Sequence, residues 1–164
     1  MAILFKNFKA KFFEILPLIL LFIISLNGAS VLDFKYVSVN VHYILIYYWV
    51  LRLPNAIGYG FIFLSGIITD VVLGLPMGAT PLTLLTISAV AAYVRVVTVR
   101  ISLVNDWVSF IPALLLANSI YFIILHFSNY SIDYLYLFQN SIFTLIFYPF
   151  LWVIFSMILR MIKN

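Results

Sequence analysis

Long apolar runs separated by short polar breaks dominate the chain. A membrane-spanning helix needs about 20 mostly apolar residues, and boundaries read from such runs hold to within a few residues. The pattern therefore predicts an all-α polytopic membrane protein, a bundle of about six transmembrane helices. We expect the second run to be the shortest, tilted little or lying partly at the interface. The six predicted helices cover residues 12–28, 39–53, 56–73, 79–99, 107–127 and 134–159.

Composition supports a membrane protein and leaves no room for a soluble part. Of the 164 residues, 66% are hydrophobic and 9% are charged, whereas a soluble domain carries about 25% charge. Since no polar stretch is long enough to fold alone, residues 1–164 are expected to form a single integral membrane domain. The chain has no cysteine, which excludes disulfides, thiolate metal sites and cysteine nucleophiles.

The N-terminal stretch allows two interpretations. Its basic start, apolar run and small-residue end fit a cleaved signal peptide. They also fit a retained first helix, which we favour because a chain with many later spans needs no cleavage.

Basic residues fall almost entirely on one side of the predicted topology, and Lys and Arg stay on the cytoplasmic side of a membrane. If the N-terminus is cytoplasmic, Lys35 is outside and the other eight basic residues are inside. We therefore predict an N-in/C-in bundle in the bacterial inner membrane. The net charge of +4 then reflects topology rather than a nucleic-acid partner, and the rings of Tyr47, Tyr48 and Trp49 are expected at the inner interface. The inside residues are Lys6, Lys9, Lys11, Arg52, Arg95, Arg100, Arg160 and Lys163.

The third predicted helix carries small residues and one carboxylate at four-residue spacing: Gly58, Ile62, Gly66, Asp70 and Gly74. Residues four apart share a helix face, and small residues on that face let another helix approach closely. A central carboxylate exposed to lipid would cost about 2.5–3.5 kcal/mol. Asp70 is therefore expected on the packed face.

A tight turn follows Asp70, with the sequence Gly74-Leu-Pro76-Met-Gly78. The two glycines permit positive φ and the proline fixes a bend. The next helix should begin with Gly78 or Thr80 as its N-cap, so that its free amides face the carboxylate of Asp70. Asp70 either locks this corner or relays a proton or ion. The absence of a second carboxylate at comparable depth favours the lock.

Later helices carry small and weakly polar residues of the kind that pack helices together in lipid. Thr83, Ala113 and Ala117 are expected at helix contacts, and Asn118 is expected to bond to a neighbouring helix. His42 lies near the outer end of a helix, without metal spacing or a nucleophile beside it, and is expected to be a surface or capping residue.

No catalytic pattern is present: there is no HExxH, GxSxG, P-loop or GxGxxG sequence. We predict a protein that is not an enzyme and that uses no cofactor.

Residues 48–93, about a quarter of the chain, resemble the rod shape-determining protein MreD family. In that family an aromatic residue and Trp precede Pro, an apolar helix ending in Gly-x-x-x-Asp, a Gly-x-Pro-x-Gly turn and a helix ending near Ala-Tyr. The sequence departs from the pattern after the turn, where Pro81 is extra. The corresponding residues are Tyr48-Trp49, Pro54, Gly58, Gly66-x-x-x-Asp70, Gly74-Leu-Pro76-Met-Gly78 and Ala92-Tyr93.

The resemblance implies a non-enzymatic component of the bacterial cell-elongation complex. Such a protein maintains rod shape by binding an MreC-like protein and, through it, the MreB filament, RodA and a penicillin-binding transpeptidase. The MreD family is also similar in shape to the six-helix substrate-binding subunits of energy-coupling-factor vitamin transporters, which gives an alternative function. The bulky first predicted helix, with only Ser25 and Ala29 as small residues near its end, counts against that alternative.

Overall fold

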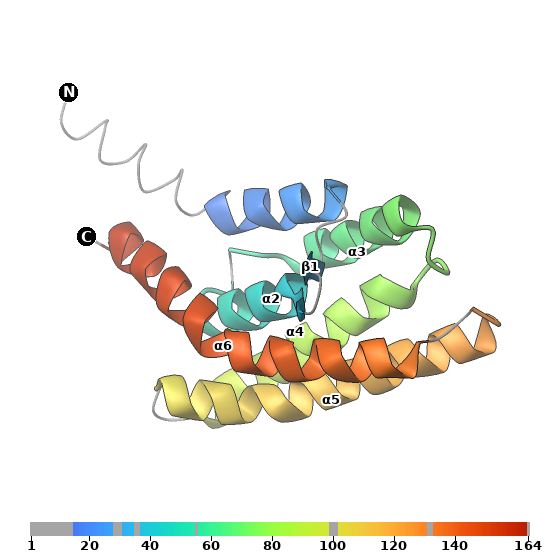
Figure 1. Cartoon of the computed structure of the whole chain (residues 1–164). Helices are drawn as coiled ribbons and strands as arrows, with labels where there is room; N and C mark the ends of the chain where they lie inside the picture. Colours follow the sequence, from blue (N-terminus) through green and yellow to red (C-terminus); the bar gives the residue numbers. More distant parts are fainter. Residues whose placement is uncertain are drawn as a thin grey trace.

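The structure is a computed structural model that describes residues 15–27, 31–34, 37–54, 56–98, 102–130 and 133–163. In Figure 1 successive helices alternate in direction, and the described chain starts and finishes at the same end of the bundle. Several expectations concern residues outside the described ranges: those for Lys6, Lys9, Lys11, Ala29, Lys35 and Arg100.

Six helices in the described ranges follow the order of the six predicted runs. Three of them, α4, α5 and α6, are long and apolar enough to cross a membrane, which is consistent with a membrane protein. The other three are shorter. The helices are Ile15–Leu26, α2 (Val41–Arg52), α3 (Tyr59–Leu73), α4 (Ala79–Val97), α5 (Leu103–Phe127) and α6 (Tyr134–Lys163).

The prediction that residues 39–53 form a membrane span is wrong. α2 has 12 residues, or about 18 Å at 1.5 Å per residue, whereas the hydrocarbon core is about 30 Å thick. Every residue from His42 to Leu51 is buried. A helix that is apolar on all sides is stable when protein surrounds it, and α2 is the enclosed centre of this bundle.

A β-hairpin precedes α2 where the sequence predicts a loop. Strand β1 (Val31–Phe34) pairs antiparallel with β2 (Val37–Asn40). The alternation in Val-Ser-Val-Asn is a strand signal that could have been recognised. β2 is bonded to α6: the Asn140 side chain donates to Ser38 Oγ at 2.6 Å, and the Asn40 N–H donates to Thr144 Oγ1 at 2.8 Å. These bonds fix the point at which α2 begins.

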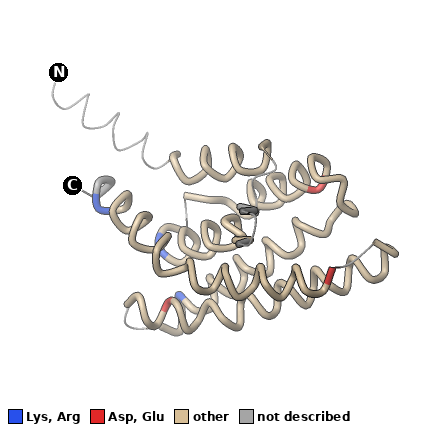
Figure 2. Tube along the Cα trace, viewed as in Figure 1, with Lys and Arg blue, Asp and Glu red and all other residues tan. Residues whose placement is uncertain are grey.

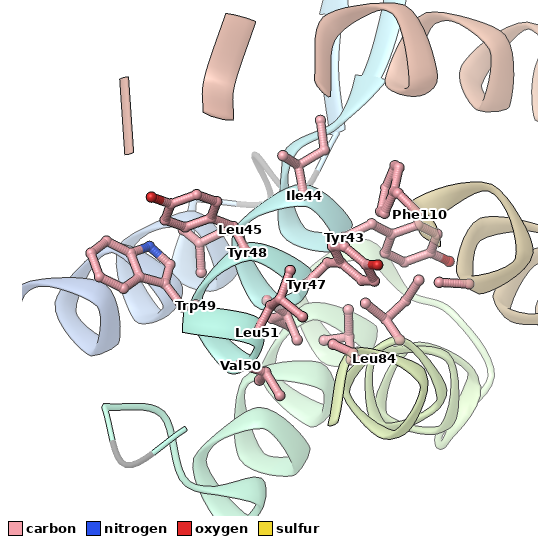
Figure 3. Packing of buried hydrophobic residues seen from close by; sticks show 14 of the residues in the cluster. Tyr43, Ile44, Leu45, Tyr47, Tyr48, Trp49, Val50, Leu51, Leu84 and Phe110 are labelled. Atoms are coloured by element: carbon pink, nitrogen blue, oxygen red, sulfur yellow. The ribbon is translucent and has the colours of Figure 1, made fainter. Parts of the chain in front are cut away.

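The aromatic residues of α2 fill the core rather than the inner interface predicted for them. Tyr47, Tyr48 and Trp49 are at most 1% exposed. The rings of Tyr47 and Phe110 are 5.0 Å apart, and Phe110 stacks on Tyr148 at 4.6 Å. Figure 3 shows α2 side chains projecting to both sides of the helix, with Phe110 and Leu84 among those around them. Because α2 is enclosed, its rings meet other helices instead of lipid.

Charge is distributed unevenly along the bundle. Figure 2 shows the described Lys and Arg positions gathered at one end, whereas acidic positions occur at both ends. Arg52 ends α2 and Arg95 lies in the last turn of α4. A one-sided basic end is what the positive-inside rule requires of a cytoplasmic end.

Candidate functional site

Asp70 closes the corner between α3 and α4. Its side chain is fully buried, Oδ2 accepts from the Gly78 N–H at 2.8 Å, and Oδ1 accepts from the Thr80 N–H at 3.0 Å. These amides belong to the start of α4, where backbone N–H groups lack partners within the helix and the helix dipole favours negative charge. The expected contact between Asp70 and the next helix is therefore present.

The turn has the backbone geometry that its glycines predict. Gly74 has φ +64° and Gly78 has φ +98°, both in the left-handed region that glycine adopts without steric cost. Gly74 ends α3, and the Leu75 N–H bonds to the Asp70 carbonyl at 2.9 Å. The Pro76 carbonyl then accepts from Ala79 at 3.1 Å. Asp70 holds the corner with both its side chain and its main chain.

Gly66 is the point of closest approach between α3 and α4. A Cβ built there would lie 2.6 Å from Cα and N of Pro81, which is well inside contact distance. Pro81, the departure from the MreD pattern, therefore fills the space that Gly66 leaves. Ser65 and Thr69, beside Gly66 on the same helix, are also buried, as expected for a packed small-residue face.

Gly58 does not belong to that face, contrary to the prediction. It is exposed, and a Cβ there would meet only Phe61, at 3.5 Å. Gly58 is the N-cap of α3, so it precedes the helix instead of lying on its packed side.

The other predicted packing residues lie in helix contacts. Thr83, Ala113 and Ala117 are fully buried. The Asn118 side-chain N–H donates to Ser141 Oγ at 2.7 Å and so joins α5 to α6. This is the interhelical role expected of Asn118.

A cavity of about 230 Å³ opens beside the corner. It lies among the starts of α2, α4 and α6 and the ends of α3 and α5, and polar side chains and tyrosine rings supply most of its lining. Neither Lys nor Arg is among its lining residues in the part of the chain that the structure describes. Sequence reasoning identified Thr83 and Asn118, but only as packing residues. The polar lining residues are Asn40, His42, Tyr43, Thr69, Thr80, Thr83, Asn118, Tyr121, Tyr130, Asp133, Tyr136 and Asn140.

His42 is a lining residue that the sequence misplaced. Expected at the surface, it is 1% exposed, because β2 delivers the start of α2 into the bundle. Its Nε2 lies 3.2 Å from Ser25 Oγ, and the Ser25 hydroxyl donates to the Leu21 carbonyl at 2.9 Å. Its Nδ1 is buried with no hydrogen-bond partner.

A buried ion pair at the other end of the bundle was also missed. The Arg52 guanidinium donates to Asp106, and Trp152 Nε1 donates to the same carboxylate at 3.0 Å. Arg52 also lies over the Trp152 ring, 5.5 Å from its centroid. The cluster ties α2, α5 and α6 together.

Asp106 was expected in a loop with Arg100, yet it lies in the first turn of α5. Ser102 caps this helix and accepts from the Asn105 N–H at 3.2 Å. A serine in this position is a helix-start signal that could have moved the predicted boundary from Trp107 to Leu103.

An apolar groove of about 530 Å³ runs between α5 and α6. Its walls include Leu115 and Phe138, which are 62% and 65% exposed, and the bonded pair Asn118 and Ser141 also lines it. In the described residues no group of three His, Asp or Glu side chains could hold a metal ion. The groove therefore offers a surface for packing rather than for chemistry.

Comparison with family models, with curated proteins and with solved structures gives no match. The MreD resemblance rests on the motif residues between Tyr48 and Tyr93.

Proposed function

We propose that the protein is a non-enzymatic inner-membrane component of the bacterial cell-elongation machinery, of the MreD kind, with both termini in the cytoplasm. It binds an MreC-like protein and, through it, the MreB filament, RodA and a penicillin-binding transpeptidase. The observation that carries the proposal is the use of the motif carboxylate. Both oxygens of Asp70 hold backbone amides of the next helix, which suits a structural corner and supports the lock over a proton relay.

The groove between α5 and α6 supports a docking role. Its lining runs from Ile111 to Ile123 and from Tyr134 to Leu145, so it follows two helices for about 18 Å, or three turns. A single transmembrane helix, such as that of an MreC-like partner, presents apolar side chains to such walls. Polar groups like the Asn118–Ser141 pair add hydrogen bonds across helices in lipid.

A groove-filling variant tests the docking surface. Ser119→Trp places a large ring in the groove, whereas Leu64→Trp places the same ring on the exposed side of α3. Tagged proteins are purified in mild detergent and their partners identified by mass spectrometry. We expect the wild type and Leu64→Trp to recover an MreC-like single-pass protein, and Ser119→Trp to lose most of it. Recovery of no such partner by the wild type contradicts the proposal.

Depletion in the native host tests the cellular role. Rounding of rod-shaped cells under the microscope supports the elongation role. Normal shape together with vitamin auxotrophy would instead support a substrate-binding subunit of an energy-coupling-factor transporter.

A further inference from the structure

We propose that the cavity beside the α3–α4 corner binds a small single-ring organic molecule that carries an N–H or O–H donor and no negative charge. This goes beyond the docking role and does not depend on it. The cavity and the α5–α6 groove share only Asn118 and Leu137 among their lining residues.

The hydrogen bonds around His42 determine what its ring offers to the cavity. The Ser25 hydroxyl gives its proton to the Leu21 carbonyl, so its oxygen can only accept from His42 Nε2. The proton of the neutral ring is therefore on Nε2, and Nδ1 carries a lone pair. Nδ1 is buried and unpartnered in a residue that lines the cavity. It needs a donor, which the protein does not supply and a ligand can.

The charge of the lining selects against anions. Asp133 is a lining residue, and no Lys or Arg in the described chain accompanies it. A carboxylate or phosphate would meet the lone pair of Nδ1 and the charge of Asp133 without a compensating cation. Like charges placed together are a means of rejecting a ligand. A neutral or singly cationic molecule avoids this repulsion.

The walls and the volume set the shape of the ligand. Tyr43, Tyr121 and Tyr130 present aromatic rings to the cavity, and such rings favour a planar aromatic partner or a cation over their faces. The cavity, about 230 Å³, is below the usual range of about 300–1,000 Å³ for drug-sized ligands. One ring with a short substituent fits these limits.

A lipid acyl chain is a poorer occupant, because it has no donor and would leave Nδ1 unpaired. Water alone is the competing outcome, since a polar cavity of this size can hold water.

The test uses two probes of the same size, nicotinamide and nicotinate, with the full chain in lipid nanodiscs. Nicotinamide is neutral and carries N–H donors, whereas nicotinate is an anion without them. Binding is measured by ligand-observed nuclear magnetic resonance. We expect a Kd on the order of 1 mM for nicotinamide, as is usual for so small a ligand, and at least tenfold weaker binding of nicotinate.

Three variants assign any binding to the cavity. Thr83→Leu adds bulk at a lining residue, and Thr86→Leu makes the same change on α4 at a residue outside the lining. In both wild-type residues the hydroxyl bonds to a carbonyl of its own helix, so the two changes are matched. His42→Gln can keep the contact with Ser25 and removes Nδ1. We expect Thr83→Leu and His42→Gln to lose binding at least tenfold and Thr86→Leu to retain it.

Three results overturn the proposal. They are equal binding of the two probes, binding that survives both Thr83→Leu and His42→Gln, and no binding of nicotinamide at concentrations about tenfold above the expected Kd. Since co-purification of an MreC-like partner is a separate measurement, failure here is distinguishable from failure of the docking role.

Discussion

Two carboxylates of this chain meet helix N-termini, and burial separates their effects. Asp70 is fully buried and bonds to Gly78 and Thr80. Asp133 is exposed and accepts from the Tyr136 N–H at 3.0 Å at the start of α6. A hydrogen bond to a charged group contributes more when water cannot replace it. The same residue type is therefore structural at one corner and a replaceable cap at the other.

Asp70→Asn should destabilise the fold by about 2 kcal/mol. Asparagine has one acceptor oxygen, so its NH2 group would face one of the two amide donors. Asp133→Asn is the matched control and should change stability by less than about 0.5 kcal/mol, since Asn and Asp are equally good N-caps. Unfolding by SDS titration in mixed micelles measures both. Equal stability of Asp70→Asn and the wild type would rule out the lock.

Gly66→Ala should cost about 2 kcal/mol or more, because its Cβ would meet the Pro81 backbone, which no side-chain rotation can move. Gly60→Ala, in the same helix with nothing within 4 Å of the added Cβ, should gain about 0.5–1 kcal/mol from the loss of glycine's flexibility. Thermal unfolding in detergent compares the pair. A loss of stability in Gly60→Ala as large as that in Gly66→Ala would show that close packing is not the cause.

At the scale of elements, α2 organises the bundle from inside. Its start is fixed by the bonds from β2 to α6, and its end by the Arg52–Asp106 pair. Between these points its apolar residues are buried on all sides. A helix of 12 residues is marginal alone in water, so tertiary contacts must hold it in place.

The Arg52–Asp106 pair should show strong coupling. Asp106→Asn alone leaves the guanidinium without its charge partner and should cost about 3 kcal/mol, although the amide oxygen can still accept from Trp152. Arg52→Gln alone should cost a similar amount, since it leaves Asp106 unpaired. The double variant should be more stable than the sum of the two losses predicts, by about 1–3 kcal/mol. Additive losses in the SDS titration would show that the pair contributes no coupling.

At the scale of the whole molecule, the described basic residues lie at one end of the bundle and the α3–α4 corner lies at the other. This separation fits the N-in/C-in orientation, in which the corner and its cavity face outward. Three long apolar helices, with shorter helices and a hairpin packed beside them, give a bundle whose interior is not a stack of equal spans.

The absence of cysteine from the sequence permits a clean test of orientation. Met77→Cys, at the corner and 77% exposed in the wild type, should react with a membrane-impermeant maleimide in intact cells. Arg160→Cys, near the end of α6, should react only after the membrane is opened. The reverse pattern would invert the topology and place the cavity on the cytoplasmic side.

The sequence alone determined the helical class, the order of the helices and the corner at Asp70. Each of these depends on local signals: apolar runs, glycines at positions of positive φ, and a carboxylate within ten residues of the amides it accepts from. Tertiary structure decided the rest. Apolar content does not distinguish a helix facing lipid from one facing protein, so α2 and its rings were misplaced. The partners of His42 and Asp106 lie 17 and 54 residues away, and contacts at such separations come from packing that no local pattern encodes.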